Sequence, residues 1–414
     1  YFTINSTEMY QTKRNIRNFS VKLTQGLSKP RQKLYLYLLY GMSKSQHIFL
    51  SEIARSLNEK TDLTYTIKRL SRNVARGEDL PRLHDNYLDA LRTSIPDNPL
   101  VIVDESDIAK PYAEKMEALG QIHDGSKKTI EKGYTTINFA LSTARTKHPL
   151  PLYTHVCSAH EEGFDSMNVE KAKGFNTIDR FMDETACTFV MDQLYDSNKM
   201  FKYIHNLDHY FITRLKDPRY LIHKNRRIKV PDLANRRKGK ISFSTEIQGI
   251  QYDLKVSHIQ VRLPVLKDTP LNMVVVYGYG KKPMKLLTNQ VIKSKKDVLW
   301  ILKGYITRWR IEELFRVQKQ EFKLEKIQTM SLSSLRILYT LLNCIIDHYS
   351  LAIEKRTAHT QIILARARSS NALSKVKFYL YRFIRGVSHI LSFDTVGIKS
   401  FHKIERRSNQ LSFW

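Results

Sequence analysis

Residues Val101–Ile108 read VIVDESDI, and they give the strongest local indication of the fold class. Four consecutive apolar residues, Leu100–Val103, run directly into Asp104. A short apolar run of this kind is typical of a strand that is buried on both faces, and a polar residue after it lies at the strand's carboxyl end. The stretch therefore predicts a buried strand that delivers a carboxylate to the edge of a sheet.

The same pattern recurs further along the chain, where Thr188–Met191 runs into Asp192. Other strand-like runs lie at 134–142, 150–156 and 210–213, and helical periodicity between them is clearest at 176–185. Strands that alternate with helices indicate a mixed α/β core. Because α/β folds place their sites at strand ends, Asp104 and Asp192 are candidate functional residues.

The remaining sequence predicts helical ends and a β-rich middle. Apolar residues recur at helical spacing between 31 and 91 and again from about 295 onward, whereas 241–279 alternates like strands after the very basic stretch 214–240. We divide the chain into a helical N-terminal DNA-binding domain (1–95), the first part of the core (96–215), a basic and β-rich insertion (216–290), the second part of the core (291–360) and a basic helical C-terminal region (361–414).

Within the N-terminal region, Leu50–Leu57 and Leu63–Arg76 resemble two short helices joined by a turn. The second carries Lys68, Arg69 and Arg72 on its polar side. This arrangement predicts a helix-turn-helix-like DNA reader. A basic helix face that is merely solvated remains the alternative.

Charge and composition narrow the class of partner. The chain has 414 residues, with 68 Lys and Arg against 40 Asp and Glu, and a formal net charge of +28. Such an excess favours a polyanion, and we expect nucleic acid because no apolar run approaches a membrane span. Three scattered cysteines and no secretory segment favour the cytoplasm. The absence of a phosphate-binding loop motif argues against a nucleotide cofactor, and the histidines show no zinc spacing.

A second informative stretch is Tyr305–Lys319, YITRWRIEELFRVQK. On one regular helix, Tyr305, Arg308, Glu312 and Lys319 would lie within about 60° of one another, beside an apolar seam. A carboxylate flanked by two cations and a phenol suits a metal site that handles phosphate. The alternative is a solvated helix face with spaced charges. With Asp104 and Asp192, Glu312 could hold two divalent ions about 3.5–4 Å apart, and Mg²⁺ suits a set made only of carboxylates.

The sequence here resembles the bacterial DDE insertion-sequence transposases, whose catalytic core is RNase H-like. The spacing of Tyr305, Arg308, Glu312 and Lys319 matches the Y-x2-R-x3-E-x6-K signature of one cut-and-paste branch. VIVDESDI resembles the strand with the family's first aspartate, and FVMDQLYD the strand with the second. The resemblance covers roughly 100–329, and it implies catalytic and metal-binding roles for Asp104, Asp192 and Glu312.

Other roles follow from the same resemblance. Tyr305, Arg308 and Lys319 would contact phosphates of the transposon end, and so would Arg214, in FITRLK. Met284, in KKPMKLLTN, stands where relatives often have a tryptophan that stacks on a flipped base. Trp309 is a further candidate DNA contact. Several acids compete for the same roles: Glu105 or Asp107 could replace Asp104, Glu313 lies off the stripe and would face solvent or pair with a cation, and Asp196 could cap a helix.

The resemblance implies a transposase that binds terminal inverted repeats on double-stranded DNA. It would cleave them with two Mg²⁺ ions, for which Mn²⁺ would substitute, and join the 3′ ends to target DNA. A hairpin on the transposon end and a homodimer that pairs two ends are family expectations. Two alternatives remain open: an RNase H-like nuclease without strand transfer, and a domesticated transposase that binds DNA without catalysis.

Overall fold

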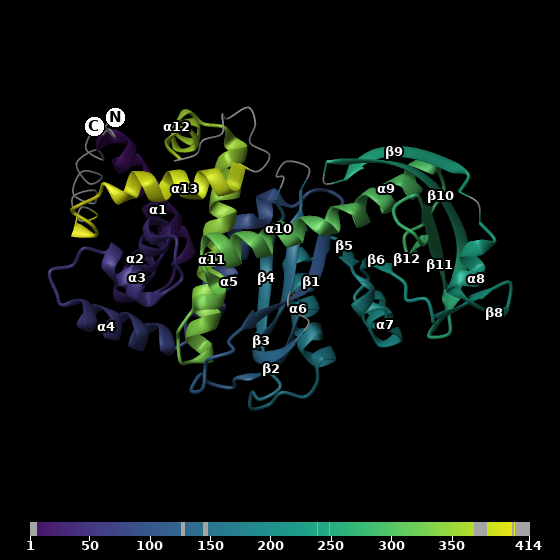
Figure 1. Ribbon diagram of the computed structural model, residues 1–414, viewed down its shortest axis with the longest axis horizontal. Coiled ribbons are helices and arrows are strands. Elements are labelled where there is room, and N and C mark those ends of the chain that lie inside the picture. Colours follow the sequence, from purple (N-terminus) through teal and green to yellow (C-terminus); the bar gives the residue numbers. More distant parts are fainter. Residues whose placement is uncertain are drawn as a thin grey trace.

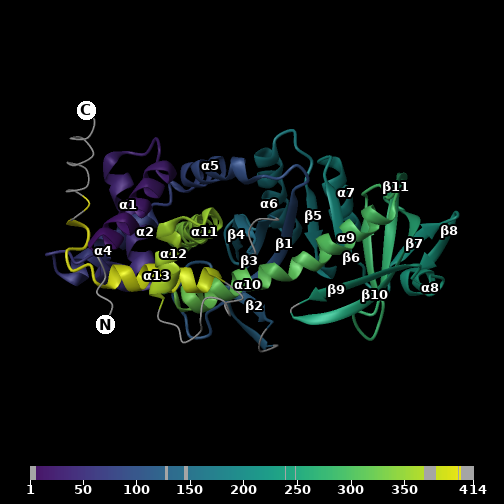
Figure 2. The same cartoon turned by 90° about the horizontal axis from the view of Figure 1, so that it is seen from above.

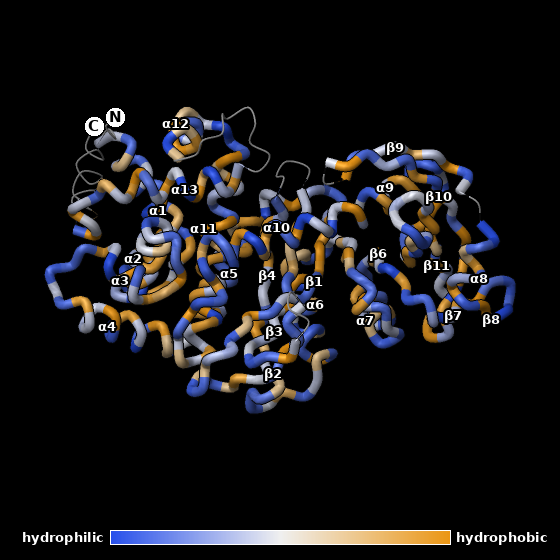
Figure 3. Tube along the Cα trace, viewed as in Figure 1, coloured by the Kyte–Doolittle hydropathy of each residue, from blue (hydrophilic) through white to orange (hydrophobic). Residues whose placement is uncertain are grey.

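The structure is a computed structural model that describes residues 6–125, 129–143, 148–237, 239–247, 249–367, 379–399 and 401. A helical part, a central sheet and a β-rich part follow one another along the longest axis (Figures 1 and 2). Hydrophobic residues run through the strands, whereas the loops around β7 and β8 are hydrophilic (Figure 3). No helix of the described residues is long and apolar enough to cross a membrane.

The two ends of the chain build one helical part. The N-terminal helices are α1 (Ser6–Leu23), α2 (Lys29–Ser45), α3 (Leu50–Ser56), α4 (Leu63–Ala75) and α5 (Leu80–Leu91), and the C-terminal helices are α11 (Leu332–Lys355), α12 (Ala358–Arg366) and α13 (Tyr379–Ser392). Buried Asp394, just after α13, accepts hydrogen bonds from Lys13 and from the Tyr40 hydroxyl. The N-terminal and C-terminal helices are therefore joined through a buried charge. The rest of the predicted C-terminal basic region (368–378, 400 and 402–414) lies outside the described residues.

The central sheet contains β1 (Leu100–Ala109), β2 (Gly120–Asp124), β3 (Thr129–Ser142), β4 (Leu150–Cys157), β5 (Thr188–Met191) and β6 (Tyr210–Arg214). Its order is β4-β3-β1-β5-β6, in which β4, β3 and β1 pair antiparallel and β1, β5 and β6 pair parallel. This is the RNase H-like arrangement, so the predicted fold class is confirmed. The helix α6 (Met167–Met182) packs closely on β3, because a Cβ at Gly174 would lie 2.1 Å from Phe139 Cε2.

The β-rich insertion continues the same sheet. It contains β7 (Tyr220–His223), β8 (Arg226–Lys229), α8 (Val230–Asn235), β9 (Ile241–Ile247), β10 (Ile250–Leu263), β11 (Leu266–Tyr277) and β12 (Met284–Thr288). The strand β12 pairs antiparallel with β6, and β11 and β10 follow it outward. The helix α7 (Asn198–Asn206) connects β5 to β6. Because β12 pairs with a core strand, the insertion extends the sheet on the side of β6.

A long helical segment then returns along the sheet toward the helical part (Figure 1). It consists of α9 (Lys295–Ile306), a 3-10 turn at Thr307–Trp309, α10 (Arg310–Arg316) and a π-helical turn at Val317–Glu321. A capping box of Ser294 and Asp297 fixes its start. This segment carries the predicted third acid across the carboxyl ends of the central strands.

Candidate active site

The register of the parallel strands places three predicted site residues in one row. Val103 of β1 pairs with Met191 of β5, and Met191 pairs with Thr213 of β6. The next residues along these strands are Asp104, Asp192 and Arg214. Since neighbouring strands lie about 4.8 Å apart, the two acids are neighbours and Arg214 stands beside the second. The row lies where the parallel pairing ends, because β5 stops at Met191 and β6 at Arg214. The prediction that Asp104 ends its strand is wrong, since β1 continues to Ala109 through its antiparallel pairing with β3.

Glu312 reaches this row from α10, and Arg308 links it to the first acid. The Arg308 guanidinium donates through Nη1 to Asp104 Oδ2 at 2.6 Å, and its Nη2 lies 3.5 Å from Glu312 Oε1. The Asp104 and Arg308 side chains are only 13% and 21% exposed, whereas Glu312 is 52% exposed. The second acid is fixed separately, since Asp192 Oδ1 accepts from the Leu194 backbone N–H at 2.7 Å.

The helix through this site is less regular than the sequence pattern predicts. We expected one α-helix over Tyr305–Lys319, but a 3-10 turn at Thr307–Trp309 and a π-helical turn at Val317–Glu321 interrupt it. A 3-10 turn overwinds a helix and a π turn underwinds it, so their effects on side-chain direction oppose each other. Arg308 contacts Asp104, and Lys319 Nζ lies 3.5 Å from Asp107 Oδ1, so both still face β1.

The electrostatics of the row suit a divalent cation. Burial, with smaller contributions from the charges of Asp192 and Glu105, raises the pKa of Asp104 to about 7 against the opposing effect of Arg308. Such a raised pKa shows that the pocket holds more negative charge than it can solvate or pair. Hard carboxylate oxygens in this position fit Mg²⁺ or Mn²⁺. The three acids do not bring their oxygens within 4.8 Å of one another, and Arg308 contacts two of them.

The competing acids have other partners. Glu105 pairs with Lys171 at 2.6 Å. Glu313 is buried rather than solvent-facing, and it pairs with Arg316 at 2.7 Å. Asp196 does not cap α7, because Ser197 does, and it instead accepts from the Lys216 backbone at 2.8 Å. These contacts leave Asp104 as the acid of β1 that stands beside Asp192.

The side chains that are predicted to contact DNA differ in their exposure to solvent. Tyr305 is 8% exposed and hydrogen-bonds to Arg308, and Trp309 is half-buried in the 3-10 turn. Met284 is only 3% exposed and packs in an apolar cluster with Leu254 and Val276. A DNA wedge at Met284 stays a prediction, and in this structure β12 directs that side chain into the core.

The helix α4 carries the three N-terminal cations that the sequence pattern assigns to DNA binding. The helices α3 and α4 are joined by a short turn, and Asp62 caps α4 by accepting from the Thr64 N–H. Lys68 and Arg72 are exposed, while Arg69 contacts both carboxylate oxygens of Glu59 at 2.7 and 2.8 Å. Tyr65 lies on the same helix and is 69% exposed, and the sequence pattern did not single it out.

A buried polar network beside the site was also missed by sequence reasoning. Asn138 lies opposite Asp104 in the register of β3 and β1. Its Oδ1 accepts from Thr154 at 2.9 Å, Thr154 accepts from Asn343 Nδ2 at 2.9 Å, and Asn343 accepts from Gln318 Nε2 at 2.8 Å. The network connects the π-helical turn to the sheet. Its clearest signal in the sequence is a polar residue inside an apolar run, as Asn343 is in α11.

This network predicts a cost in stability when its middle member is removed. Asn343→Leu would leave the buried Gln318 Nε2 without its acceptor and remove the donor to the Thr154 hydroxyl, so the free energy of unfolding should fall by about 1–3 kcal/mol. Denaturant unfolding measures this change. Ser350→Ala on the same helix is the control, since the Ser350 hydroxyl bonds only to its own helix at Ile346 O, and it should change stability much less. Equal effects would contradict the network's role.

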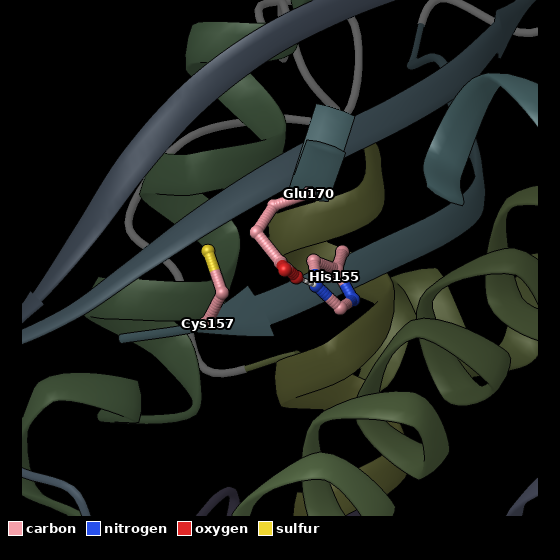
Figure 4. Close-up of side chains that lie close together, drawn as sticks. All are labelled: His155, Cys157 and Glu170. Atoms are coloured by element: carbon pink, nitrogen blue, oxygen red, sulfur yellow. Dashed lines mark hydrogen bonds and ion pairs between the residues drawn. The ribbon is translucent and has the colours of Figure 1, made fainter. Parts of the chain in front are cut away.

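A second group of possible ligands lies where β4 and α6 meet (Figure 4). Of the described residues, only His155, Cys157 and Glu170 bring three ligand atoms within 4.8 Å of one another. The His155 and Glu170 atoms that could bind a metal already have partners within the protein. His155 pairs with Glu170, and Lys173 donates to both Glu170 oxygens at 2.7 and 2.9 Å. Burial also raises the pKa of the Cys157 thiol to about 12. These contacts make the group a buried ion pair with a neighbouring thiol.

Comparisons with known proteins agree with this geometry. A family model described as "Transposase DDE domain" matches residues 96–346. No curated protein matches the chain. Among solved structures, a chain from the piggyBac transposase synaptic complex with hairpin DNA is 8% identical, with a TM-score of 0.49. The match covers 93% of this chain and 78% of the piggyBac chain. The NurA nuclease from Sulfolobus solfataricus is 9% identical, with a TM-score of 0.27. The match covers 62% of this chain and 98% of the nuclease chain.

Neither structural likeness reaches a TM-score of 0.5, so the assignment depends on the family match. That match spans more than half of the chain, and it includes β1, β5 and the helix that carries Glu312. Members of this family use divalent metal ions, which agrees with the carboxylate row. The chain therefore belongs to the family of transposases with a DDE catalytic domain.

Proposed function

We propose that this chain cuts and joins DNA at the ends of an insertion sequence, with Asp104, Asp192 and Glu312 as its metal-binding acids. The observation that carries the proposal is the pairing of Val103 with Met191, which puts Asp104 and Asp192 side by side, with Glu312 linked to the first through Arg308. Two Mg²⁺ or Mn²⁺ ions bound there would activate an attacking oxygen and stabilise the leaving oxygen of an in-line displacement.

The cations around the acids would hold the DNA backbone. Arg308 presents a planar guanidinium that can bind a phosphate through two N–H groups. Lys319 now pairs with Glu325 at 2.9 Å and with Asp107 at 3.5 Å, so it would exchange these partners for a phosphate. The Tyr305 hydroxyl lies beside Arg308 and would donate to the same backbone segment.

Arg308 connects metal binding to DNA binding. Its guanidinium neutralises Asp104 and approaches Glu312, and these are two of the acids that would hold the ions. A divalent ion and a guanidinium compete for the same carboxylate oxygens. Metal binding would therefore release Arg308 toward the phosphate, and a bound phosphate would draw Arg308 away from the acids. By thermodynamic linkage, each ligand then favours the other.

The N-terminal helices would read the transposon end. The exposed face of α4 carries Lys68 and Arg72, and Arg69 is partly engaged by Glu59. A second helix with such a face suits the major groove. The family expectations of a hairpin on the transposon end, of two protomers that pair two ends, and of action in a bacterial cytoplasm are part of the same proposal.

We expect Lys68→Gln combined with Arg72→Gln to weaken binding of the terminal inverted repeat. The slope of log affinity against log salt should fall by roughly 2, because each lost phosphate contact removes about one counterion. Fluorescence anisotropy at several salt concentrations measures both quantities. Lys22→Gln, an exposed change on α1, is the matched control and should leave the slope unchanged. An unaltered slope in the double variant would remove α4 from the DNA interface.

The experiment that tests the proposed function uses duplexes from the DNA that flanks the coding region. Incubation of the full chain with Mg²⁺ should cut each duplex at a fixed position, at the junction between the end of the insertion sequence and the flanking DNA. The cut should leave a 3′-hydroxyl on the end of the insertion sequence. A hairpin, if formed, runs as a denaturation-resistant band on a sequencing gel. Cutting at random positions, or equal cutting of a shuffled duplex, would contradict a transposase that recognises its ends.

A further inference from the structure

A lysine of α6 contacts the segments that follow both aspartates of the row. Successive side chains of a strand point to opposite faces of the sheet. Asp104 meets Arg308 on one face, and the next residue of β1, Glu105, points to the other. There Glu105 pairs with Lys171 at 2.6 Å. The first aspartate therefore has a cation behind it that the proposed reaction does not use.

The same lysine contacts the turn that follows the second aspartate. Asp192 is the N-cap residue of the 3-10 turn Gln193–Tyr195. The Lys171 Nζ lies over the Tyr195 ring, 4.5 Å from its centroid, where a cation is attracted to the face of the ring. Lys171 thus joins the residue after the first aspartate to the last residue of the turn that begins at the second.

Both aspartates accept a hydrogen bond from the segments that Lys171 holds. The Glu105 backbone N–H donates to Asp104 Oδ1 at 2.9 Å. In the turn after the second aspartate, the Leu194 backbone N–H donates to Asp192 Oδ1 at 2.7 Å. A shift of either segment would therefore turn the carboxylate that is bonded to it.

Burial and packing keep Lys171 in place. Its side chain is only 12% exposed, and the Tyr195 side chain is buried. Salt therefore screens these contacts much less than it screens contacts at the surface. The helix α6 is itself fixed, because Phe175 packs edge-on against Phe189 of β5, with 4.7 Å between the ring centroids. It provides a rigid support from which one side chain reaches both β1 and the turn after β5.

We propose that Lys171 is a positioning residue that holds Asp104 and Asp192 at the separation that two divalent ions require. The inference rests on the proposed function, in which these acids bind the metal. Ions about 3.5–4 Å apart need closely placed ligands. Loss of a residue that orients metal ligands typically costs roughly 10–100-fold in metal affinity. Lys171 acts before the metal binds, by fixing the two carboxylates relative to each other.

Lys171→Met tests this role because charge and position predict opposite results. The variant loses a cation near the acids and frees the Glu105 carboxylate, and charge alone would then tighten the binding of a divalent ion. Loss of positioning would weaken it. We expect the full chain with Lys171→Met to bind Mn²⁺ without DNA roughly tenfold more weakly than wild type. Paramagnetic resonance of free Mn²⁺ measures this affinity without any cleavage.

Two further variants of α6 are the controls. Lys171→Arg keeps a cation that can pair with Glu105 and lie over the Tyr195 ring, so it should restore Mn²⁺ affinity. Lys173→Met removes a cation of the same helix that pairs with Glu170 at 2.7 Å, so it should bind Mn²⁺ like wild type. In cleavage, Lys171→Met should need roughly tenfold more Mn²⁺ for half of its maximal rate. The maximal rate itself should change little.

Three results would overturn the positioning role. The first is a Mn²⁺ affinity of Lys171→Met that equals or exceeds that of Lys173→Met. The second is a failure of Lys171→Arg to restore the affinity. The third is loss of the thermal unfolding transition in Lys171→Met, because the lysine would then be structural. Failure of the proposed function would look different, since wild type and the double variant Asp104→Asn with Asp192→Asn would then bind Mn²⁺ equally.

Discussion

Asp104→Asn, Asp192→Asn and Glu312→Gln should each lower the rate of end cleavage by roughly a thousandfold or more. Each change removes a charged ligand from the metal site, and metal stabilisation of a phosphoryl transition state contributes several kcal/mol. Binding of end DNA should persist or strengthen without metal, because the DNA-facing row then carries less negative charge. Single-turnover cleavage and equilibrium binding, measured on the same preparations, separate the two effects.

Glu313→Gln is the control for this set. Glu313 follows Glu312 on α10, but it pairs with Arg316 and with the Tyr381 hydroxyl outside the row. This variant should cleave at close to the wild-type rate. The acids would prove structural rather than catalytic if all three neutral variants lost their thermal unfolding transition, or if they cleaved as fast as Glu313→Gln.

Arg308→Gln should change metal and DNA affinity in opposite directions. In the metal-free chain the variant lacks the cation that competes for Asp104, so Mn²⁺ should bind without DNA at least about tenfold more tightly. A hydrogen bond to a charged group contributes about 1.5–3 kcal/mol, which corresponds to roughly tenfold or more. The bond to Asp104 should dominate, since Glu312 is half exposed and its attraction is screened. Paramagnetic resonance of free Mn²⁺ measures this affinity without any catalysis.

The same variant should bind end DNA more weakly and should lose the dependence of DNA affinity on metal. Arg316→Gln is the matched control, because Arg316 lies on the same helix and pairs with Glu313. It should leave both affinities unchanged. If Arg308→Gln bound Mn²⁺ no more tightly than Arg316→Gln, the competition between the guanidinium and the metal would be refuted.

The central sheet could be predicted from the sequence because its signals are local. The run Thr188–Met191 is a strand with the predicted bounds, and it correctly placed Asp192 at a strand end. The apolar run before Asp104 correctly indicated a strand, but β1 continues beyond Asp104 to Ala109. A strand that is buried on both faces of the sheet has a continuous apolar run, which is visible in the sequence alone. The helix from Lys295 also begins where its periodicity starts.

Contacts between distant residues could not be predicted in this way. Arg308 and Asp104 are 204 residues apart, and Lys13 and Asp394 are 381 apart, so nothing local marks either pair. Met284 shows the same limit, because an apolar residue suits both a wedge and a core, and the sequence does not show that the pairing of β12 buries it here. The irregular turns around α10 were missed because a fixed helical period was assumed.

The most direct test of the central claim is the joining reaction. Full-length chain, Mg²⁺, a labelled duplex with a pre-cut transposon end and a supercoiled plasmid should yield labelled plasmid joined at the 3′-hydroxyl. Asp192→Asn should yield none. Labelled joint molecules that depend on Mg²⁺ and on Asp192 are the predicted result. If the pre-cut end stayed unjoined while the same preparation cleaved intact end duplexes, the transposase account would be contradicted and a nuclease on the same fold favoured.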